Sequence, residues 1–263
     1  MGKKLSIVGG GKMGEALLAG LLESKWTEPE DISVVEPDEG RLKELQEKYK
    51  ETVISAELLK SPSFLLAVKP QMVTVICQEL NKLKPKLVIS IAAGITTKSI
   101  EDYLPEGTSV VRVMPNTPAM IGEGMAAIAP GSNATKEDLD QASSILSAVG
   151  EVVIVGENTL DAVTGLSGSG PAYLFLLAEA MISAGIRNGL DPSVADLLTR
   201  QTLLGASSLL SKSGVAPSEL RALVTSPNGT TAAAIEHLQS EQFVEIMSAA
   251  ITEATERSKE LGN

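Results

Sequence analysis

A glycine-rich turn near the start of the chain has the composition of a phosphate-binding loop. Residues 9–14 read Gly-Gly-Gly-Lys-Met-Gly, which fits the pattern G-x-G-x-x-G between an apolar run and a helical pattern. In such a turn Gly9 permits the sharp bend, Gly11 lets the backbone approach a pyrophosphate, and Gly14 lets a helix pack closely on a strand. Free N–H groups at the start of the helix would then face the phosphates. The expected dinucleotide-binding residues of the turn are Gly9, Gly11, Lys12, Met13 and Gly14, and the alternative for Lys12 is a solvated side chain.

An acidic residue follows the second apolar run at the distance expected for a ribose contact. Glu36 lies 22 residues after Gly14, where a carboxylate would bond the adenine-ribose hydroxyls of NAD and repel the 2′-phosphate of NADP. Alternatively, residues 36–38 only start the next helix, with Asp38 as its capping residue. The two roles are compatible. The charge of Glu36 favours NADH over NADPH.

Three further segments, 67–70, 90–94 and 112–118, follow other apolar runs. Ligands of an open parallel sheet lie outside the carboxyl ends of its strands, so we expect these segments to converge on the edge that carries the glycine turn. The small side chains of residues 92–94 would leave room for a nicotinamide ring. Taken singly, each segment has the alternative of an ordinary turn, with Lys69 and Arg112 as surface charges. The candidate cofactor-binding residues here are Ala67, Val68, Lys69, Pro70, Ala92, Ala93, Gly94 and Asn116.

Two polar loops in the second half of the chain lead into helical patterns. Residues 165–171 read Gly-Leu-Ser-Gly-Ser-Gly-Pro, with Pro171 suited to the first turn of a helix. Residues 226–231 read Ser-Pro-Asn-Gly-Thr-Thr, and backbone amides at such a helix start would hold a carboxylate. The alternative for either loop is ordinary helix capping with nothing bound.

The elements that position these segments differ between the two halves. Apolar runs alternate with helical patterns in the first half, which predicts a doubly wound parallel α/β sheet of Rossmann type over residues 1–157. Residues 158–263 are rich in alanine and leucine at helical spacing, which predicts an all-α domain. The expected strands are 4–8, 32–36, 64–68, 87–91, 109–113, 125–130 and 152–155. The expected helices are 12–22, 39–49, 171–189, 194–213, 231–238 and 243–261. Small residues such as Gly185 would let helices approach closely, and the helical half either buries itself against a second subunit or forms a monomeric bundle.

Composition excludes several function classes. The formal net charge of −11 argues against broad binding of nucleic acid or anionic membranes. A single cysteine, Cys77, and a single histidine, His237, leave no disulfide and no Cys/His metal site, so no metal is expected. The apolar run 5–8 is too short for a signal sequence, and the apolar run 171–186, which contains Glu179, is shorter than a membrane span. We expect a cytoplasmic enzyme.

With these segments in order, the chain resembles pyrroline-5-carboxylate reductases. The resemblance covers nearly the whole length through Gly-Gly-Gly-Lys-Met-Gly, Ala-Val-Lys-Pro-Gln, Ala-Ala-Gly, Arg-Val-Met-Pro-Asn-Thr-Pro, Gly-Leu-Ser-Gly-Ser-Gly-Pro-Ala-Tyr and Ser-Pro-Asn-Gly-Thr-Thr. It implies a Rossmann domain, a helical domain that dimerises, and an active site shared across the dimer. It also implies reduction of 1-pyrroline-5-carboxylate to L-proline by NADH or NADPH, the last step of proline biosynthesis.

The resemblance also implies roles for individual residues. The loop 229–231 holds the substrate, and Thr231 is placed near the ring nitrogen as the candidate catalytic residue. The expected substrate-binding residues are Ser169, Gly170, Gly229, Thr230 and Thr231. Two departures stand out. Many family members have Ser-Arg or Asn-Arg where this chain has Glu36 and Pro37, which puts NADPH use in doubt. Asn228 replaces a common glycine, a milder change because asparagine tolerates left-handed turns.

The chemistry of a cyclic imine suits these residues. Reduction of a ketone requires a proton donor, whereas an imine that binds protonated is converted to a neutral amine by hydride alone. Positioning would then be the main task, and Thr231 would bond the ring nitrogen or simply cap the helix. One rival is a β-hydroxyacid dehydrogenase, which needs a lysine early in the long helix where residues 171–189 have none. The other rival is a dinucleotide-sensing module without catalysis.

Overall fold

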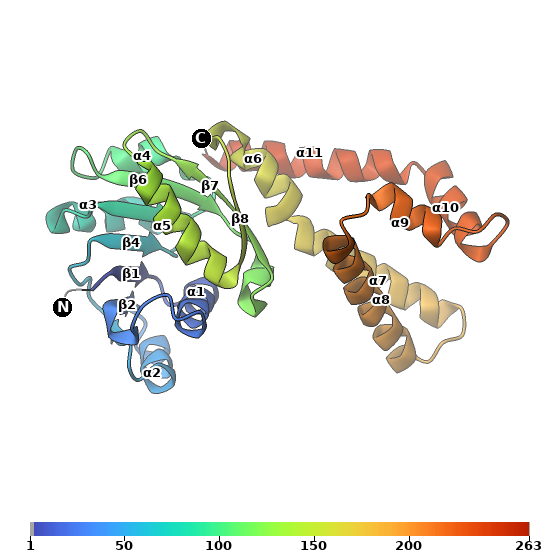
Figure 1. Cartoon of the computed structure of the whole chain (residues 1–263), viewed down its shortest axis with the longest axis horizontal. Helices are drawn as coiled ribbons and strands as arrows, with labels where there is room; N and C mark the ends of the chain where they lie inside the picture. Colours follow the sequence, from blue (N-terminus) through green and yellow to red (C-terminus); the bar gives the residue numbers. More distant parts are fainter. Residues whose placement is uncertain (1–2, 263) are drawn as a thin grey trace. The chain divides into compact units, whose positions relative to one another are not determined.

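The computed structural model describes residues 3–262 and divides into two compact units. The sheet unit contains the residues up to Ser169 together with those from Glu253 onward, and the helical unit is Gly170–Thr252. Figure 1 labels the elements of both units. Each unit is described here by itself.

The sheet unit is built on eight strands in the order β3-β2-β1-β4-β5-β6-β7-β8. The strands are β1 Leu5–Val8, β2 Ile32–Val35, β3 Val53–Ser55, β4 Ser63–Leu66, β5 Leu87–Ser90, β6 Ser109–Met114, β7 Gly124–Pro130 and β8 Gly150–Ile154. All neighbours pair in parallel except β6 and β7. The predicted doubly wound sheet is thus confirmed, with one antiparallel step. A parallel partner needs a crossover of a dozen or more residues, and the short segment 115–123 cannot provide one.

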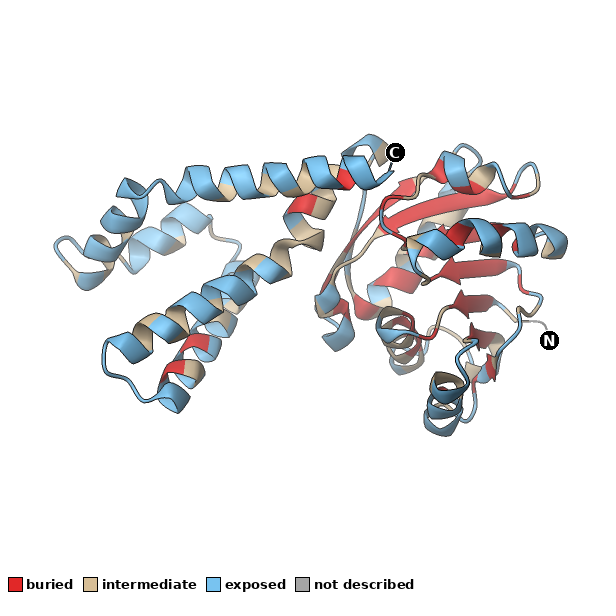
Figure 2. Ribbon diagram, turned by 180° about the vertical axis from the view of Figure 1, so that it is seen from behind, coloured by how far each residue is buried: buried red, intermediate tan, exposed pale blue. Residues whose placement is uncertain are grey.

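Helices cover both faces of this sheet, because alternate residues along each strand point to opposite sides. Leu65 and Ile89 belong to one buried cluster with α1 (Lys12–Glu23), α2 (Glu39–Lys48) and α5 (Lys136–Leu146). Phe64 and Val88 belong to a second cluster with α3 (Val73–Leu83) and α4 (Thr97–Glu101). Figure 2 shows the strands as the buried layer between these helices. The strand β3 and the helices α3, α4 and α5 were not among the predicted elements.

The helical unit contains four whole helices and the first half of a fifth. They are α7 Gly170–Arg187, α8 Pro192–Ser213, α9 Pro217–Leu223, α10 Thr230–Ser240 and α11 Phe243–Gly262, whose last residues belong to the sheet unit. A β-carbon on Gly185 would lie 3.2 Å from that of Ala195, so a small residue lets α7 approach α8. Large apolar side chains are nevertheless exposed, among them Phe175, Leu197 and Leu204. Figure 2 shows these helices as largely exposed.

One helical run is longer than the sequence suggested. Residues 157–187 form a run that is long and apolar enough, by length and composition alone, to cross a membrane. The expectation that this segment is too short considered only residues 171–186. It was wrong on length because α6 (Leu160–Val163) and one π-helical turn, Thr164–Gly168, extend the run at its amino end. The core helix of a soluble protein meets the same criteria of length and composition.

Candidate functional site

The carboxyl ends of five adjacent parallel strands bring the predicted cofactor segments to one edge of the sheet. The N–H of Gly9, after β1, donates to the carbonyl of Val35 at 2.8 Å, and the N–H of Ala67, after β4, donates to that of Val8 at 2.8 Å. The N–H of Ile91, after β5, donates to the carbonyl of Leu66 at 3.1 Å. The segments 9–14, 36–38, 67–70, 91–94 and 115–118 therefore share an edge, as the sequence predicted.

The three glycines of the G-x-G-x-x-G pattern differ in their surroundings. Gly9 has a φ of +107°, and a β-carbon there would lie 2.5 Å from the carbonyl oxygen of Ala67. A β-carbon on Gly14 would lie 2.0 Å from the carbonyl oxygen of Gly9. Beside Gly11 there is no heavy atom within 4 Å, and this residue caps α1 without a side chain. The turn thus leaves open space and uncapped helix amides where a pyrophosphate would lie, so its residues fit a dinucleotide.

Glu36 lies against this turn. Its Oε2 accepts a hydrogen bond from the N–H of Gly10 at 3.0 Å, and its Oε1 accepts one from the N–H of Asp38 at 3.0 Å. Asp38 caps α2, since its Oδ1 accepts from the N–H of Arg41 at 2.8 Å. The capping alternative is therefore confirmed for Asp38. Glu36 is half-buried and joins the end of β2 to the glycine turn.

Arg41 holds the other side of the same glycine. Its Nε donates to the carbonyl of Gly10 at 2.9 Å, and its Nη2 pairs with Glu15 of α1. Lys48 also reaches Glu15, with its Nζ 2.7 Å from Oε1. Burial raises the pKa of Glu15, but hydrogen bonds from Lys48, Arg41 and Tyr49 outweigh burial and lower it to about 2. Glu15 is thus a carboxylate over the whole physiological range.

The loops after β4 and β5 differ in exposure. Lys69 is exposed and makes no side-chain cap at the start of its short helix, Pro70–Met72, as expected for a surface charge. In the loop after β5, Ala92 and Gly94 are buried and Ala93 is exposed. Gly94 has a φ of +76°, and its α-carbon approaches the carbonyl of Leu261 near the end of α11.

The segment after β6 corrects one expectation. Arg112 is not a surface charge, because it is only 7% exposed and its Nη1 lies 3.2 Å from Oε1 of Glu157. The sequence gave no sign of this, since Glu157 is 45 residues away. Asn116 uses its side-chain amide within the protein: Oδ1 accepts from the N–H of Met125 at 2.8 Å, and Nδ2 donates to the carbonyl of Ser167 at 3.1 Å.

The Gly-Leu-Ser-Gly-Ser-Gly-Pro loop forms a π-helical turn rather than an open loop. Its N–H at Ser169 donates to the carbonyl of Thr164 at 2.8 Å. A β-carbon on Gly168 would lie 2.5 Å from the terminal methyl of Met114, so the turn packs on the end of β6. Pro171 lies in the first turn of α7, as expected. Such turns are frequent at functional sites.

The second candidate loop lies in the helical unit. Asn228 has a φ of +57°, which is the left-handed conformation that asparagine was expected to tolerate. Gly229 caps α10 without a side-chain bond, and Thr230 and Thr231 occupy the first turn of the helix. Their amides are therefore available to an anion. Gly170 belongs to the same unit as this loop, whereas Ser169 and the cofactor segments belong to the sheet unit.

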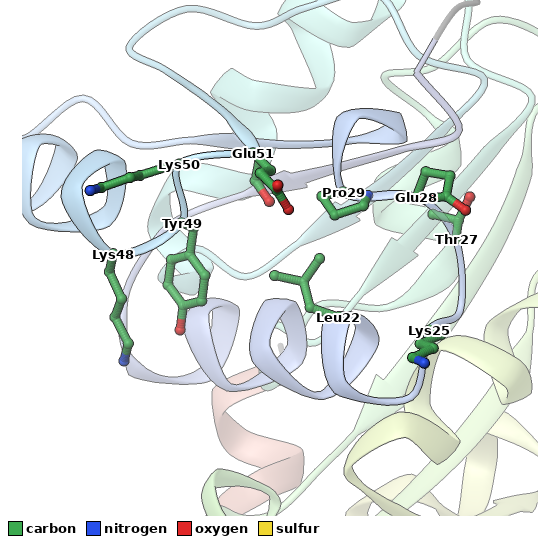
Figure 3. Close-up of a pocket in the computed structure, with 10 residues that line it drawn as sticks. Leu22, Lys25, Thr27, Glu28, Pro29, Lys48, Tyr49, Lys50 and Glu51 are labelled. Carbon is green, nitrogen blue, oxygen red and sulfur yellow. The ribbon is translucent and has the colours of Figure 1, made fainter.

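A cavity of about 710 Å³ in the sheet unit lies away from this edge. It is lined by the carboxyl ends of α1 and α2 and by Pro29 and Thr52, which precede β2 and β3 (Figure 3). Its position at the amino ends of the strands separates it from the glycine turn. Within residues 3–262 no group of histidine, cysteine, aspartate and glutamate side chains is arranged to hold a metal ion.

Comparison with known proteins decides the family. The family model described as pyrroline-5-carboxylate reductase dimerisation matches residues 157–261, and one described as NADP oxidoreductase coenzyme F420-dependent matches residues 4–94. The pyrroline-5-carboxylate reductase of Methanosarcina acetivorans is 44% identical over 99% of this chain and 98% of its own length. The pyrroline-5-carboxylate reductase of Synechocystis is 42% identical over 100% of this chain and 99% of its own length. The chain belongs to the pyrroline-5-carboxylate reductase family.

Solved structures agree with this assignment, and the predicted resemblance is confirmed. A pyrroline-5-carboxylate reductase from Coxiella burnetii is 35% identical, with a TM-score of 0.93 and 99% of each chain covered. A pyrroline carboxylate reductase from Plasmodium falciparum, crystallised with NADP bound, is 28% identical, with a TM-score of 0.85 over 99% of this chain and 98% of that one. The family accordingly joins a nicotinamide-binding sheet unit to a helical dimerisation region.

Proposed function

We propose that this protein reduces 1-pyrroline-5-carboxylate to L-proline with a nicotinamide cofactor. One observation carries the proposal. The uncapped turn 9–14 shares a sheet edge with the small-residue loop 91–94 in a chain that belongs to this family throughout its length. The β-hydroxyacid dehydrogenase alternative is disfavoured, because α7 contains no lysine.

Different residues of the sheet edge contact different parts of the cofactor. The amides after Gly11 face the pyrophosphate, Glu36 faces the adenine ribose, and the loops 67–70 and 92–94 line the nicotinamide end. A bound nicotinamide supplies the hydride. The negative charge of Glu36 repels a 2′-phosphate, so NADH is preferred over NADPH.

The helical unit provides the substrate loop. The first-turn amides of α10, with the hydroxyl of Thr230, hold the substrate carboxylate at the positive end of the helix dipole. Thr231 bonds the ring nitrogen and keeps the imine in line for hydride addition. The substrate binds protonated, so hydride addition to the imine carbon sends the C=N electrons to nitrogen and yields a neutral amine. Ser169 and Gly170 are further substrate-binding residues of the proposed function.

Residues 158–263, a segment that extends beyond the helical unit at both ends, act in dimerisation as well as in substrate binding. Exposed apolar side chains on α7 and α8 support this role. Large contiguous apolar patches are rare on the surfaces of monomeric proteins. The homodimer shares its active sites between subunits. The protein acts in the reducing cytoplasm, and the buried free thiol of Cys77 is consistent with that compartment.

Assay of proline formation tests the activity directly. Purified protein is mixed with pyrroline-5-carboxylate and either NADH or NADPH, and both the fall in cofactor absorbance and the proline produced are measured. Equal amounts of cofactor consumed and proline formed are expected. Cofactor binding without turnover would instead establish the sensing module, and oxidation of 3-hydroxyisobutyrate without imine reduction would establish the hydroxyacid dehydrogenase.

A further inference from the structure

The carboxylate of Glu157 binds three groups from two other elements of the sheet unit. Its Oε1 accepts from the N–H of Thr97 at 2.7 Å and from Nη1 of Arg112 at 3.2 Å. Its Oε2 accepts from the hydroxyl of Thr97 at 2.7 Å. Thr97 is 5% exposed and Arg112 is 7% exposed. Charge-assisted hydrogen bonds are stronger than neutral ones, so Glu157 ties the start of α4 to the end region of β6.

This tie holds one end of the loop that follows β5. At the other end of the loop, the N–H of Ile91 donates to the carbonyl of Leu66 at 3.1 Å, and the N–H of Ala92 donates to Oγ of Ser90 at 3.3 Å. In the middle, a β-carbon on Gly94 would lie 3.0 Å from the carbonyl oxygen of Leu261. The loop is therefore bonded at both ends and closely packed in the middle, and Glu157 supplies the one charged contact among these.

We propose that Glu157 is a positioning residue for the cofactor, acting through Thr97 on the loop 92–94. This inference rests on the proposed function, in which that loop lines the nicotinamide end. Glu157 is the first residue of the helical run 157–187 that leads into α7, so the same carboxylate fixes the loop and the start of the connection to the helical unit. Loss of the anchor lets the loop relax and weakens cofactor binding, although Glu157 itself does not touch the cofactor.

A second carboxylate in the same unit provides a matched control. Oε1 of Glu101 accepts from the N–H of Ser132 at 2.7 Å, and Oε2 accepts from its hydroxyl at 2.9 Å. These bonds repeat those of Glu157 to Thr97. They lie at the opposite edge of the sheet, because the neighbouring N–H of Gly131 donates to the carbonyl of Val110 near the start of β6. A merely structural role would give both carboxylates the same effects.

The experiment compares Glu157→Gln with Glu101→Gln in the full-length protein. NADH affinity is measured by the fluorescence of bound NADH, and thermal unfolding is measured in parallel. We expect Glu157→Gln to raise the Kd for NADH about tenfold and Glu101→Gln to change it less than about twofold, with similar shifts in Tm. Equal Kd values for the two variants would overturn the proposal.

A milder pair keeps the test decisive if Glu157→Gln fails to fold. Thr97→Val preserves the shape of the side chain and removes one bond to Glu157, and Ser132→Ala removes the equivalent bond to Glu101. Thr97→Val should raise the Kd for NADH about threefold and Ser132→Ala should leave it unchanged. An unchanged Kd in Thr97→Val would contradict the proposal.

Binding and turnover separate this inference from the proposed function. The Kd measurements need no imine substrate, so they test the role of Glu157 whether or not the protein forms proline. A protein that binds NADH without forming proline would refute the proposed activity alone. A wild-type protein that binds neither NADH nor NADPH would refute both.

Discussion

The carboxylate of Glu36 accepts a hydrogen bond from the backbone N–H of Gly10 at 3.0 Å. The residue that is expected to select the cofactor is therefore also an anchor of the phosphate-binding turn. Arg41 completes the arrangement from the other side, because its Nε donates to the carbonyl of the same glycine at 2.9 Å. Substitution of Glu36 must change both the charge near the ribose and the stiffness of the turn.

Glu36→Ser should shift cofactor preference toward NADPH. Removal of the charge takes away the repulsion of a 2′-phosphate, so the ratio of kcat/KM for NADPH to that for NADH should rise about tenfold. The loosened turn lowers affinity for both cofactors, and the ratio cancels that common loss. Steady-state kinetics with both cofactors measures this ratio of kcat/KM values. Glu51→Gln, which removes a charge at the cavity on the opposite edge, should leave the ratio unchanged. An unaltered ratio in Glu36→Ser would mean that the carboxylate does not face the ribose.

Thr231→Ala should lower turnover before it alters NADH affinity. The hydroxyl is placed to bond the ring nitrogen of the substrate and lies in a different unit from the glycine turn. We expect kcat to fall about tenfold or more and the Kd for NADH to stay within about twofold. Thr231→Ser, which keeps the hydroxyl, should recover most of the activity. Wild-type kinetics in a folded Thr231→Ala protein would remove this residue from the site.

Substitution by alanine should destabilise the protein at one glycine of the turn and leave its stability nearly unchanged at another. A β-carbon at position 14 would lie 2.0 Å from the carbonyl oxygen of Gly9, so Gly14→Ala should lower the free energy of unfolding by about 3 kcal/mol. Beside Gly11 there is no heavy atom within 4 Å, so Gly11→Ala should change that free energy by less than about 0.5 kcal/mol.

The same pair separates stability from cofactor binding. The methyl group in Gly11→Ala occupies the approach of the pyrophosphate and should raise the Kd for NADH at least about tenfold. Chemical denaturation and NADH titration are run on both variants. A Gly11→Ala protein with normal affinity for NADH would place the pyrophosphate elsewhere.

Glu15 should make part of the stability depend on acid pH. Its pKa is lowered from 4.5 to about 2, so its contribution is complete above pH 4.5 and is lost as the pH falls toward 2. Because its partner Lys48 is mostly exposed, we expect Glu15→Gln to cost only about 1–2 kcal/mol at pH 7. Urea denaturation across this pH range should show the difference from the wild type shrinking with acid. Glu23→Gln, at the exposed end of the same helix, should show no such trend.

A charge on the helical unit should disrupt the dimer. Leu197 and Leu204 are 66% and 62% exposed and lie seven residues apart on one face of α8. Leu204→Glu should therefore lower the apparent mass in sedimentation at micromolar protein. Val75→Glu provides the control, because it introduces the same charge at an exposed apolar position on α3 of the sheet unit. A dimer that survives Leu204→Glu would place the interface elsewhere.

Much of this protein follows from local sequence. The strands β1, β2 and β5 are apolar runs at nearly the predicted bounds, and residues 9–14 form the turn that the spacing of their glycines predicted. Asp38 caps its helix through a bond to an amide three residues away. These features have local signals in the sequence, so pattern and spacing suffice to predict them.

Other features depend on groups that meet only in the folded chain. Arg112 looks like a surface charge in sequence and is buried against Glu157, 45 residues later. The strand β3, only three residues long, is likewise set by its pairing with β2 at the edge of the sheet. The glycine turn, Glu36 and the loop before α10 were evident in the sequence, whereas the anchors Arg41 and Glu157 were not. Only tertiary structure identifies such anchors, because long-range hydrogen bonds between ordinary charged residues leave no periodic or local pattern.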